Sequence, residues 1–182
     1  MLTTAQLASG LHDVLASPGD EGTLEHIVIR PAVGTREFRR KVYLSPEGGV
    51  EGDRWLSASW LKLEDGRSDP RVQVSLMNAR LLRLISEGLE QRMCLAGDNL
   101  IVDLNLGENN LSPGQRLAVG EIVLEITNVA HNGCGSFLSR YGKDAVKFVN
   151  SVEGKRLHLR GLFAQVIRPG VVCVGDKVCK KD

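Results

Sequence analysis

The residues best suited to chemistry are a cysteine and the polar side chains just before it. Cys134 lies between Gly133 and Gly135, so neither neighbour has a side chain that would block access to the thiol. His131 precedes the cysteine by three residues and is a candidate hydrogen-bond partner or base for it. Because a thiolate is both a nucleophile and a soft metal ligand, the loop predicts sulfur chemistry or metal ligation at Cys134.

That chemistry needs the thiolate, and a free thiol with a pKa of about 8.5 is only slightly ionised at neutral pH. We predict a helix from about Ser136 to Asn150, interrupted near Gly142, whose N-terminus would stabilise negative charge on the cysteine. Arg140 follows on this helix and is a candidate for the mouth of the same site. The alternative for Cys134 is an inert buried thiol.

His131 also has alternatives. It is either part of the site or a loop histidine in solvent. Together with Cys134 it has the spacing of half a zinc site, but the sequence shows no second half.

Three further polar residues follow glycines in two predicted turns. Asp53 and Arg54 either close their turn as an ion pair or line a pocket, and aspartate in such turns often caps backbone amides. Asn99, in Gly97-Asp98-Asn99, either satisfies its own turn or forms a hydrogen bond in the pocket. We retain all three as candidate binding residues.

Arg160 is the last candidate. We predict a strand from Leu157 to Ile167, in which Arg160 shares a face with His158 because positions two apart point the same way. An inward arginine in an apolar strand needs an anionic partner, and a cofactor phosphate would serve because guanidinium binds phosphate through two hydrogen bonds. Otherwise Arg160 faces solvent.

The composition excludes several classes of protein. In 182 residues, 23 Lys and Arg balance 22 Asp and Glu, so no net positive field indicates a nucleic-acid partner. No apolar run approaches the roughly 20 residues that span a bilayer. The first residues lack the basic segment of a secretory signal, and the four cysteines show no disulfide spacing. We therefore expect a cytoplasmic protein with reduced thiols.

The elements that must position these residues are mostly short strands. Turn signals recur every 8–12 residues, and residues 116–126 read as a β-hairpin around Gly120-Glu121. Helices are predicted at Thr4–Leu15 and after Asn78, where the apolar stripe comprises Leu81, Leu82, Ile85 and Leu89. The expected fold is mainly β (α+β), a closed or partly open barrel with a few peripheral helices. A helical extension at 1–22 would pack on a single domain at 23–180.

The order of several short motifs resembles the MOSC domain, the C-terminal module of molybdenum-cofactor sulfurases, from about Ile27 to Val178. The motifs are Gly52-Asp53-Arg54-Trp55, Gly97-Asp98-Asn99-Leu100, Leu111 with Gly114, Leu117 and Gly120, the Cys134 loop, and Arg160-Gly161 followed by Ala164, Val166, Gly170 and Gly175-Asp176. The resemblance implies a strand-rich barrel and a stand-alone MOSC protein.

The family's recurring cysteine matches Cys134. The resemblance implies that Cys134 either ligates molybdenum in a bound molybdenum cofactor or carries sulfur as a persulfide. Many stand-alone bacterial members have proline just before this cysteine, so Gly133 predicts a more flexible loop. The pyridoxal-phosphate sulfurase domain of the larger proteins is absent, so pyridoxal phosphate is not expected in this chain.

Each version of the function implies a partner. A cofactor-bound protein would reduce N-oxygenated compounds with electrons from a donor protein, since the sequence has no flavin, haem or iron–sulfur motif. A sulfur carrier would receive sulfur from a donor such as a cysteine desulfurase. The alternative from another class is a non-catalytic binding module for a phosphorylated small ligand, in which Cys134 is incidental. No nucleic-acid or membrane partner is expected.

Overall fold

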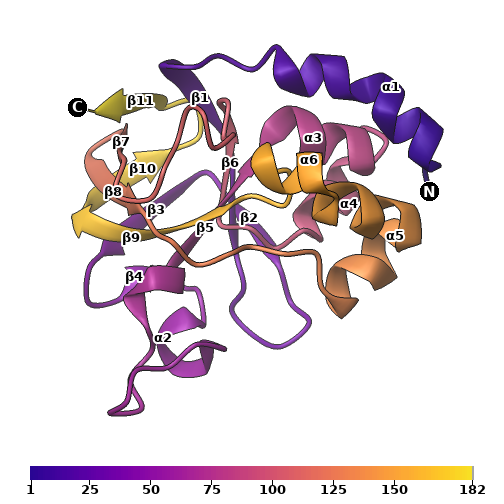
Figure 1. The fold of residues 1–182 in the computed structure, drawn as a ribbon. Coiled ribbons are helices and arrows are strands. Elements are labelled where there is room, and N and C mark those ends of the chain that lie inside the picture. Colours follow the sequence, from indigo (N-terminus) through magenta and orange to yellow (C-terminus); the bar gives the residue numbers. More distant parts are fainter. Residues whose placement is uncertain (182) are drawn as a thin grey trace.

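The fold is a closed β-barrel, in a computed structural model that describes residues 1–181. The barrel strands are β1 Glu21–Ile29, β5 Val74–Asn78, β6 Leu100–Asp103, β7 Arg116–Val119, β8 Ile122–Ile126, β9 Leu162–Arg168 and β11 Lys177–Lys181. They are ordered β11-β7-β8-β9-β5-β6-β1, and pairing of β11 with β1 closes the ring (Figure 1). Only β5 and β6 pair in parallel within this ring. The predicted strand-rich α+β barrel is confirmed, as is the hairpin formed by β7 and β8.

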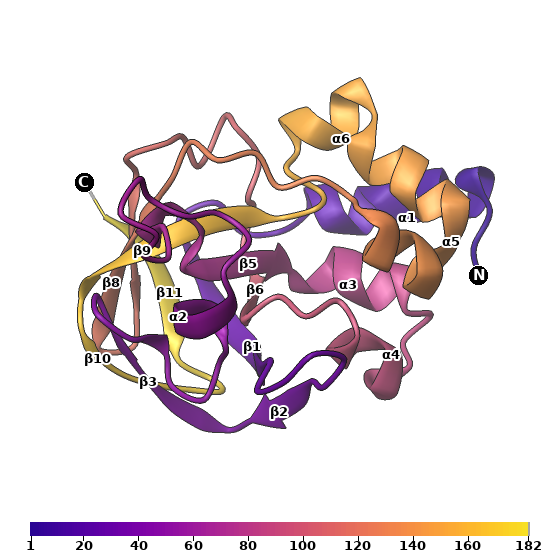
Figure 2. The ribbon, with the colours of Figure 1, turned by 90° about the horizontal axis from the view of Figure 1, so that it is seen from below.

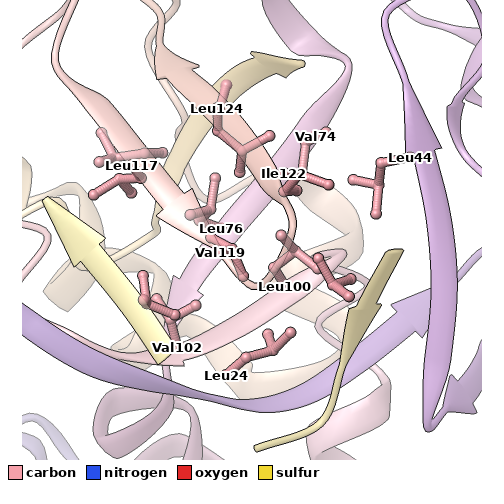
Figure 3. Close-up of a cluster of buried hydrophobic side chains, with 14 of the residues drawn as sticks. Leu24, Leu44, Val74, Leu76, Leu100, Val102, Leu117, Val119, Ile122 and Leu124 are labelled. Carbon is pink, nitrogen blue, oxygen red and sulfur yellow. The ribbon is translucent and has the colours of Figure 1, made fainter. Parts of the chain in front are cut away.

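The barrel interior is filled by alternate residues of its strands. In β8, for example, Ile122, Leu124 and Ile126 are buried while the residues between them are half-buried. Figure 3 shows aliphatic side chains from opposite walls meeting in this core. The period of two that indicated strands in the sequence is therefore the period of burial.

A smaller sheet and short helices extend the barrel at one end. Strands β10 Gly170–Cys173, β3 Lys41–Ser45 and β4 Gly49–Val50 form this sheet, while β2 Glu37–Arg39 pairs with β1. Helix α2 Trp55–Ala58 follows β4, and a 3-10 turn at Pro70–Val72 precedes β5. These segments carry one side of the site described below.

Helices gather on one side of the barrel (Figure 2). They are α1 Thr4–Leu15, α3 Ala79–Ile85, α4 Glu90–Cys94, α5 Gly135–Asn150 and α6 Val152–Arg156. The predicted N-terminal helix is confirmed at both ends, and Thr3 with Gln6 forms its capping box. Helix α1 packs on α3 and α5. Strand β1 already begins at Glu21, and the division of the chain at residue 22 stays a prediction. Within residues 1–181, no helix is both long and apolar enough to cross a bilayer.

The helix predicted after Asn78 is shorter than expected. Asn78 does cap α3, accepting a hydrogen bond from the Leu81 amide at 2.9 Å. The helix ends at Ile85, because Glu87 and Gly88 take positive φ angles of 57° and 72°. Leu89 therefore lies beyond the helix and is 57% exposed, so its assignment to the buried stripe was wrong.

The strand predicted from Leu157 was also wrong at its start, because β9 begins at Leu162. Helix α6, which is capped by the Ser151 side chain, ends at Arg156, and residues 157–160 form a turn. Gly161 has φ 101°, and a Cβ atom there would lie 2.1 Å from the Leu76 carbonyl oxygen. His158 and Arg160 consequently lie in a turn and do not share a strand face.

Candidate functional site

A cavity of about 510 Å³ brings together residues from distant parts of the sequence. Six of the eight predicted site residues line it: Asp53, Arg54, His131, Cys134, Arg140 and Arg160. Asn99 is fully buried and supports this cavity from behind its lining residues. His158 does not line the cavity, because its turn directs the imidazole to the Leu106 carbonyl oxygen, 2.6 Å from Nδ1.

Cys134 lies at the start of α5 and is exposed. Burial by itself raises the pKa of the thiol, but the nearby backbone N–H groups of Phe137 and Ser136 and the charge of Arg160 lower the pKa below its ordinary value overall. The predicted helix that begins just after the cysteine is thus confirmed. The arrangement favours a thiolate that is accessible from the cavity.

The loop before the cysteine has a restraint that the sequence analysis missed. Asn150 accepts a hydrogen bond from the Gly133 amide at 2.9 Å and donates one to the Gly133 carbonyl at 3.1 Å. Asn150 reaches this loop because α5 is kinked at Gly142, where φ is 87°, as the sequence predicted. A proline at position 133 would lack the amide, so Gly133 allows a contact that proline would prevent.

The His131 side chain lies in the cavity wall and is only 10% exposed. Its ring stacks on Phe163 with a centroid separation of 4.1 Å, and its Nδ1 lies 3.7 Å from Asp98 Oδ1. Burial and the positive charges of Arg160 and Arg30 lower the pKa of His131 well below its ordinary value. The imidazole is therefore neutral at pH 7, and its buried Nδ1 has no hydrogen-bond partner within residues 1–181.

Arg160 has an internal anionic partner that was not foreseen. Its Nη1 donates to both carboxylate oxygens of Asp98, at 2.9 and 2.8 Å. Its guanidinium also lies 5.0 Å from the centroid of the Phe137 ring. Burial raises the pKa of Asp98, and the charge of Arg160 opposes this effect. The Arg160 Nε is buried and has no partner in the described part of the chain.

Asp53 pairs with Arg30 rather than with its neighbour Arg54. Arg30 Nε and Nη2 donate to the Asp53 carboxylate at 2.8 and 3.0 Å, and the Arg30 backbone amide donates to it at 2.9 Å. Asn99 donates to Asp53 at 3.1 Å and accepts from the Ser75 amide at 3.1 Å. Asn99 therefore fixes the wall that carries Asp53. Arg30 escaped the sequence analysis because nothing local marks an arginine at the end of a strand.

Positive charge exceeds negative charge in this cavity. Its lining includes Arg30, Arg36, Arg54, Arg140 and Arg160, whereas its acidic residues are Asp53 and Asp98. Each aspartate is already paired with an arginine. Arg36 has a buried Nε without a partner among the described residues, and burial with the charges of Arg140 and Arg30 lowers its pKa.

Aromatic rings complete the cavity wall. Trp55, Trp60 and Phe163 line it, and Trp60 is 67% exposed. An anionic ligand with a planar part therefore suits the cavity. In residues 1–181, no three His, Cys, Asp or Glu side chains gather in a way that would hold a metal ion by themselves.

The fold and the site define a class of protein: a closed barrel with a cysteine at a helix N-terminus beside an arginine-rich cavity. A sequence model of the MOSC domain matches residues 64–179, so the chain belongs to the MOSC domain family.

Solved structures agree with this fold. YuaD from Bacillus subtilis is 18% identical with a TM-score of 0.61, covering 87% of this chain and 94% of its own. YiiM from Escherichia coli is 16% identical with a TM-score of 0.56, covering 88% and 70%. YiiM from Geobacillus stearothermophilus is 12% identical with a TM-score of 0.57, covering 88% and 75%. No protein of curated function matches the sequence.

Proposed function

We propose that this chain is a stand-alone MOSC protein that binds the molybdenum cofactor beside Cys134. The observation that carries the proposal is the combination of an exposed thiol of lowered pKa with an arginine-rich cavity. Buried nitrogens of Arg36, His131 and Arg160 in this cavity have no partners among the described residues. Unpaired buried polar atoms are costly unless a ligand satisfies them.

The residues present fit that group. The Cys134 thiolate is a soft ligand suited to a metal such as molybdenum. Arg36, Arg54 and Arg140 would bind a phosphate, and Trp55 and Trp60 offer faces for a planar ring system. When bound, the cofactor would supply two-electron redox chemistry. The chain would then reduce N-oxygenated compounds with electrons from a donor protein, in the cytoplasm.

A second candidate function rests on the exposure of the same thiol. The Cys134 thiolate would attack the terminal sulfur of a donor persulfide, such as that of a cysteine desulfurase. A bond forms between Cys134 Sγ and that sulfur, the donor's S–S bond breaks, and the donor leaves as a thiolate. Cys134 then carries the persulfide. The exposed position of Cys134 at a helix start favours this reaction.

Native mass spectrometry with elemental analysis distinguishes the two candidates, using protein from a molybdenum-replete host. We expect stoichiometric molybdenum in the wild type and in Cys173→Ala, and its loss in Cys134→Ala. A mass increase of one sulfur on Cys134 without metal would favour the carrier. If the wild-type protein carries neither molybdenum nor an added sulfur, both candidate functions are contradicted. A phosphorylated ligand that Cys134→Ala retains would favour a binding module.

A further inference from the structure

The His131 ring is held in one orientation by its surroundings. One face stacks on Phe163, with a centroid separation of 4.1 Å. Its Nδ1 faces the turn before β9, because a Cβ atom at Gly161 would lie only 3.5 Å from it. Nδ1 also lies 3.7 Å from Asp98 Oδ1, and the Asp98 side chain is only 1% exposed. The protein therefore surrounds the Nδ1 side of the ring.

Asp98 presents a negative charge to this side of the ring. Arg160 Nη1 donates to both of its carboxylate oxygens, at 2.9 and 2.8 Å, which favours the ionised form. A lone pair on His131 Nδ1 would face this charge unfavourably, whereas an N–H group there would point its positive end toward it. Because the partner of one ring nitrogen decides which nitrogen carries the proton, the carboxylate favours the proton on Nδ1.

The other ring nitrogen, Nε2, is open. The buried side-chain atoms without partners within residues 1–181 are Arg36 Nε, His131 Nδ1 and Arg160 Nε. His131 Nε2 also forms no hydrogen bond in this part of the chain, so it is not buried. It opens toward the space that the ring lines, which comprises the arginine-rich cavity and a smaller one beside it. A neutral imidazole with its proton on Nδ1 has a lone pair on Nε2 and is an acceptor there, whereas arginine can only donate.

We propose that Asp98 is a positioning residue that holds His131 with its proton on Nδ1, so that Nε2 accepts a hydrogen bond from the ligand of the arginine-rich cavity. The ligand then carries an N–H or O–H group at this wall in addition to its anionic group, as a planar nitrogen heterocycle with a phosphate would. Hydrogen bonds at such sites are often long in the free protein, so the 3.7 Å separation between Nδ1 and Asp98 should shorten on binding. The ligand contact rests on the proposed function, whereas the tautomer does not.

Long-range ¹⁵N–¹H correlation spectra of the labelled full chain at pH 7 test the tautomer, because they report which ring nitrogen of each histidine carries a proton. The chain has four histidines, and the signal missing from His131→Gln identifies His131. His158 is the internal reference, since its Nδ1 lies 2.6 Å from the Leu106 carbonyl oxygen, which can only accept. We expect the same Nδ1–H pattern for His131. An Nε2–H pattern, or protons on both nitrogens, would overturn the proposal.

Asp98→Asn tests the role of the carboxylate in the same spectra. The new amide keeps an oxygen for Arg160 and offers its NH2 group to His131 Nδ1, so the ring should move its proton to Nε2. His158 should keep its pattern. If His131 retained the Nδ1–H pattern in this variant, Asp98 would not be the positioning residue. The wild-type spectrum decides the tautomer whether or not the variant folds.

Molybdenum content tests the contact between Nε2 and the ligand. A glutamine side chain places its amide near the position of Nε2, whereas asparagine places it near Nδ1. We expect His131→Gln to retain about fivefold more molybdenum than His131→Asn, the effect of about one hydrogen bond. His12→Asn, at an exposed histidine, should match the wild type. Equal content in the two His131 variants would overturn the contact. Wild-type protein without molybdenum would instead contradict the proposed function, and the spectra would still decide the tautomer.

Discussion

At the residue scale, the reactivity of Cys134 follows from its position at the start of a helix. The first amides of a helix have no intrahelical acceptor, so those of Ser136 and Phe137 are available to the sulfur. A nearby guanidinium at Arg160 adds to this effect, although Arg160 is itself paired with Asp98. Exposure and a lowered pKa together distinguish Cys134 from an inert cysteine.

We predict that Cys134 reacts with iodoacetamide before the other cysteines, and that its rate reaches half-maximum at a pH below that of an ordinary thiol. The rate rises with pH because only the thiolate reacts, and the lowered pKa moves this rise to lower pH. Peptide mass mapping after timed alkylation between pH 5 and 10 gives the profile. Cys94 is the internal control, since burial raises the pKa of its thiol. An equal profile for both cysteines would contradict the assignment.

At the element scale, the kink in α5 decides where the cysteine loop lies. Gly142 turns the chain so that the last residue of the helix, Asn150, returns to Gly133 beside the first turn. One helix therefore supplies both the amides that face the sulfur and the side chain that holds the preceding loop. The position of Cys134 depends on contacts within a single continuous segment.

We expect Asn150→Ala to shift the alkylation profile of Cys134 toward the ordinary thiol pKa, because the loop loses both hydrogen bonds to Gly133. The same change should lower the free energy of unfolding by about 1 kcal/mol, since two half-buried backbone groups of Gly133 lose their partners. Chemical denaturation and the alkylation profile measure the two effects. Asn109→Ala, at an exposed position, is the control. Lower stability with an unchanged profile would show that Asn150 does not position the thiol.

At the scale of the whole molecule, closure of the barrel determines which residues meet. Pairing of β11 with β1 joins the two ends of the sheet, and the parallel pair β5 and β6 places Ser75 beside Asn99. Asn99 in turn holds Asp53, which comes from a third segment. The site therefore depends on the barrel as a unit.

We predict that Leu124→Ala lowers the free energy of unfolding by about 2–5 kcal/mol, because the leucine is fully buried in the barrel and the change leaves a cavity. Urea denaturation followed by circular dichroism measures this loss. Val174→Ala, at a residue that is 38% exposed, should change stability by only about 0.5 kcal/mol. Similar losses for both variants would mean that the barrel interior is not the main source of stability.

Much of this organisation was predictable because it depends on local signals. Alternating apolar residues predicted the β7–β8 hairpin, and Asn78 predicted the start of α3. The end of α3 was not predictable from its apolar stripe, because positive φ angles at Glu87 and Gly88 overrode the periodicity at Leu89. The turn before β9 was missed for a similar reason: the close approach of Gly161 to Leu76 is a tertiary contact.

The sequence by itself determined the barrel class, the helix that follows Cys134 and six of the residues that line its cavity. These features depend on side-chain periodicity, on glycine positions and on the order of motifs, all of which are local properties of the sequence. Only the tertiary structure decided the pairings: Asp53 with Arg30, Arg160 with Asp98, and Asn150 with Gly133. An ion pair or hydrogen bond depends on distance in space, and the closed barrel and the kinked helix set those distances between residues that the sequence keeps apart.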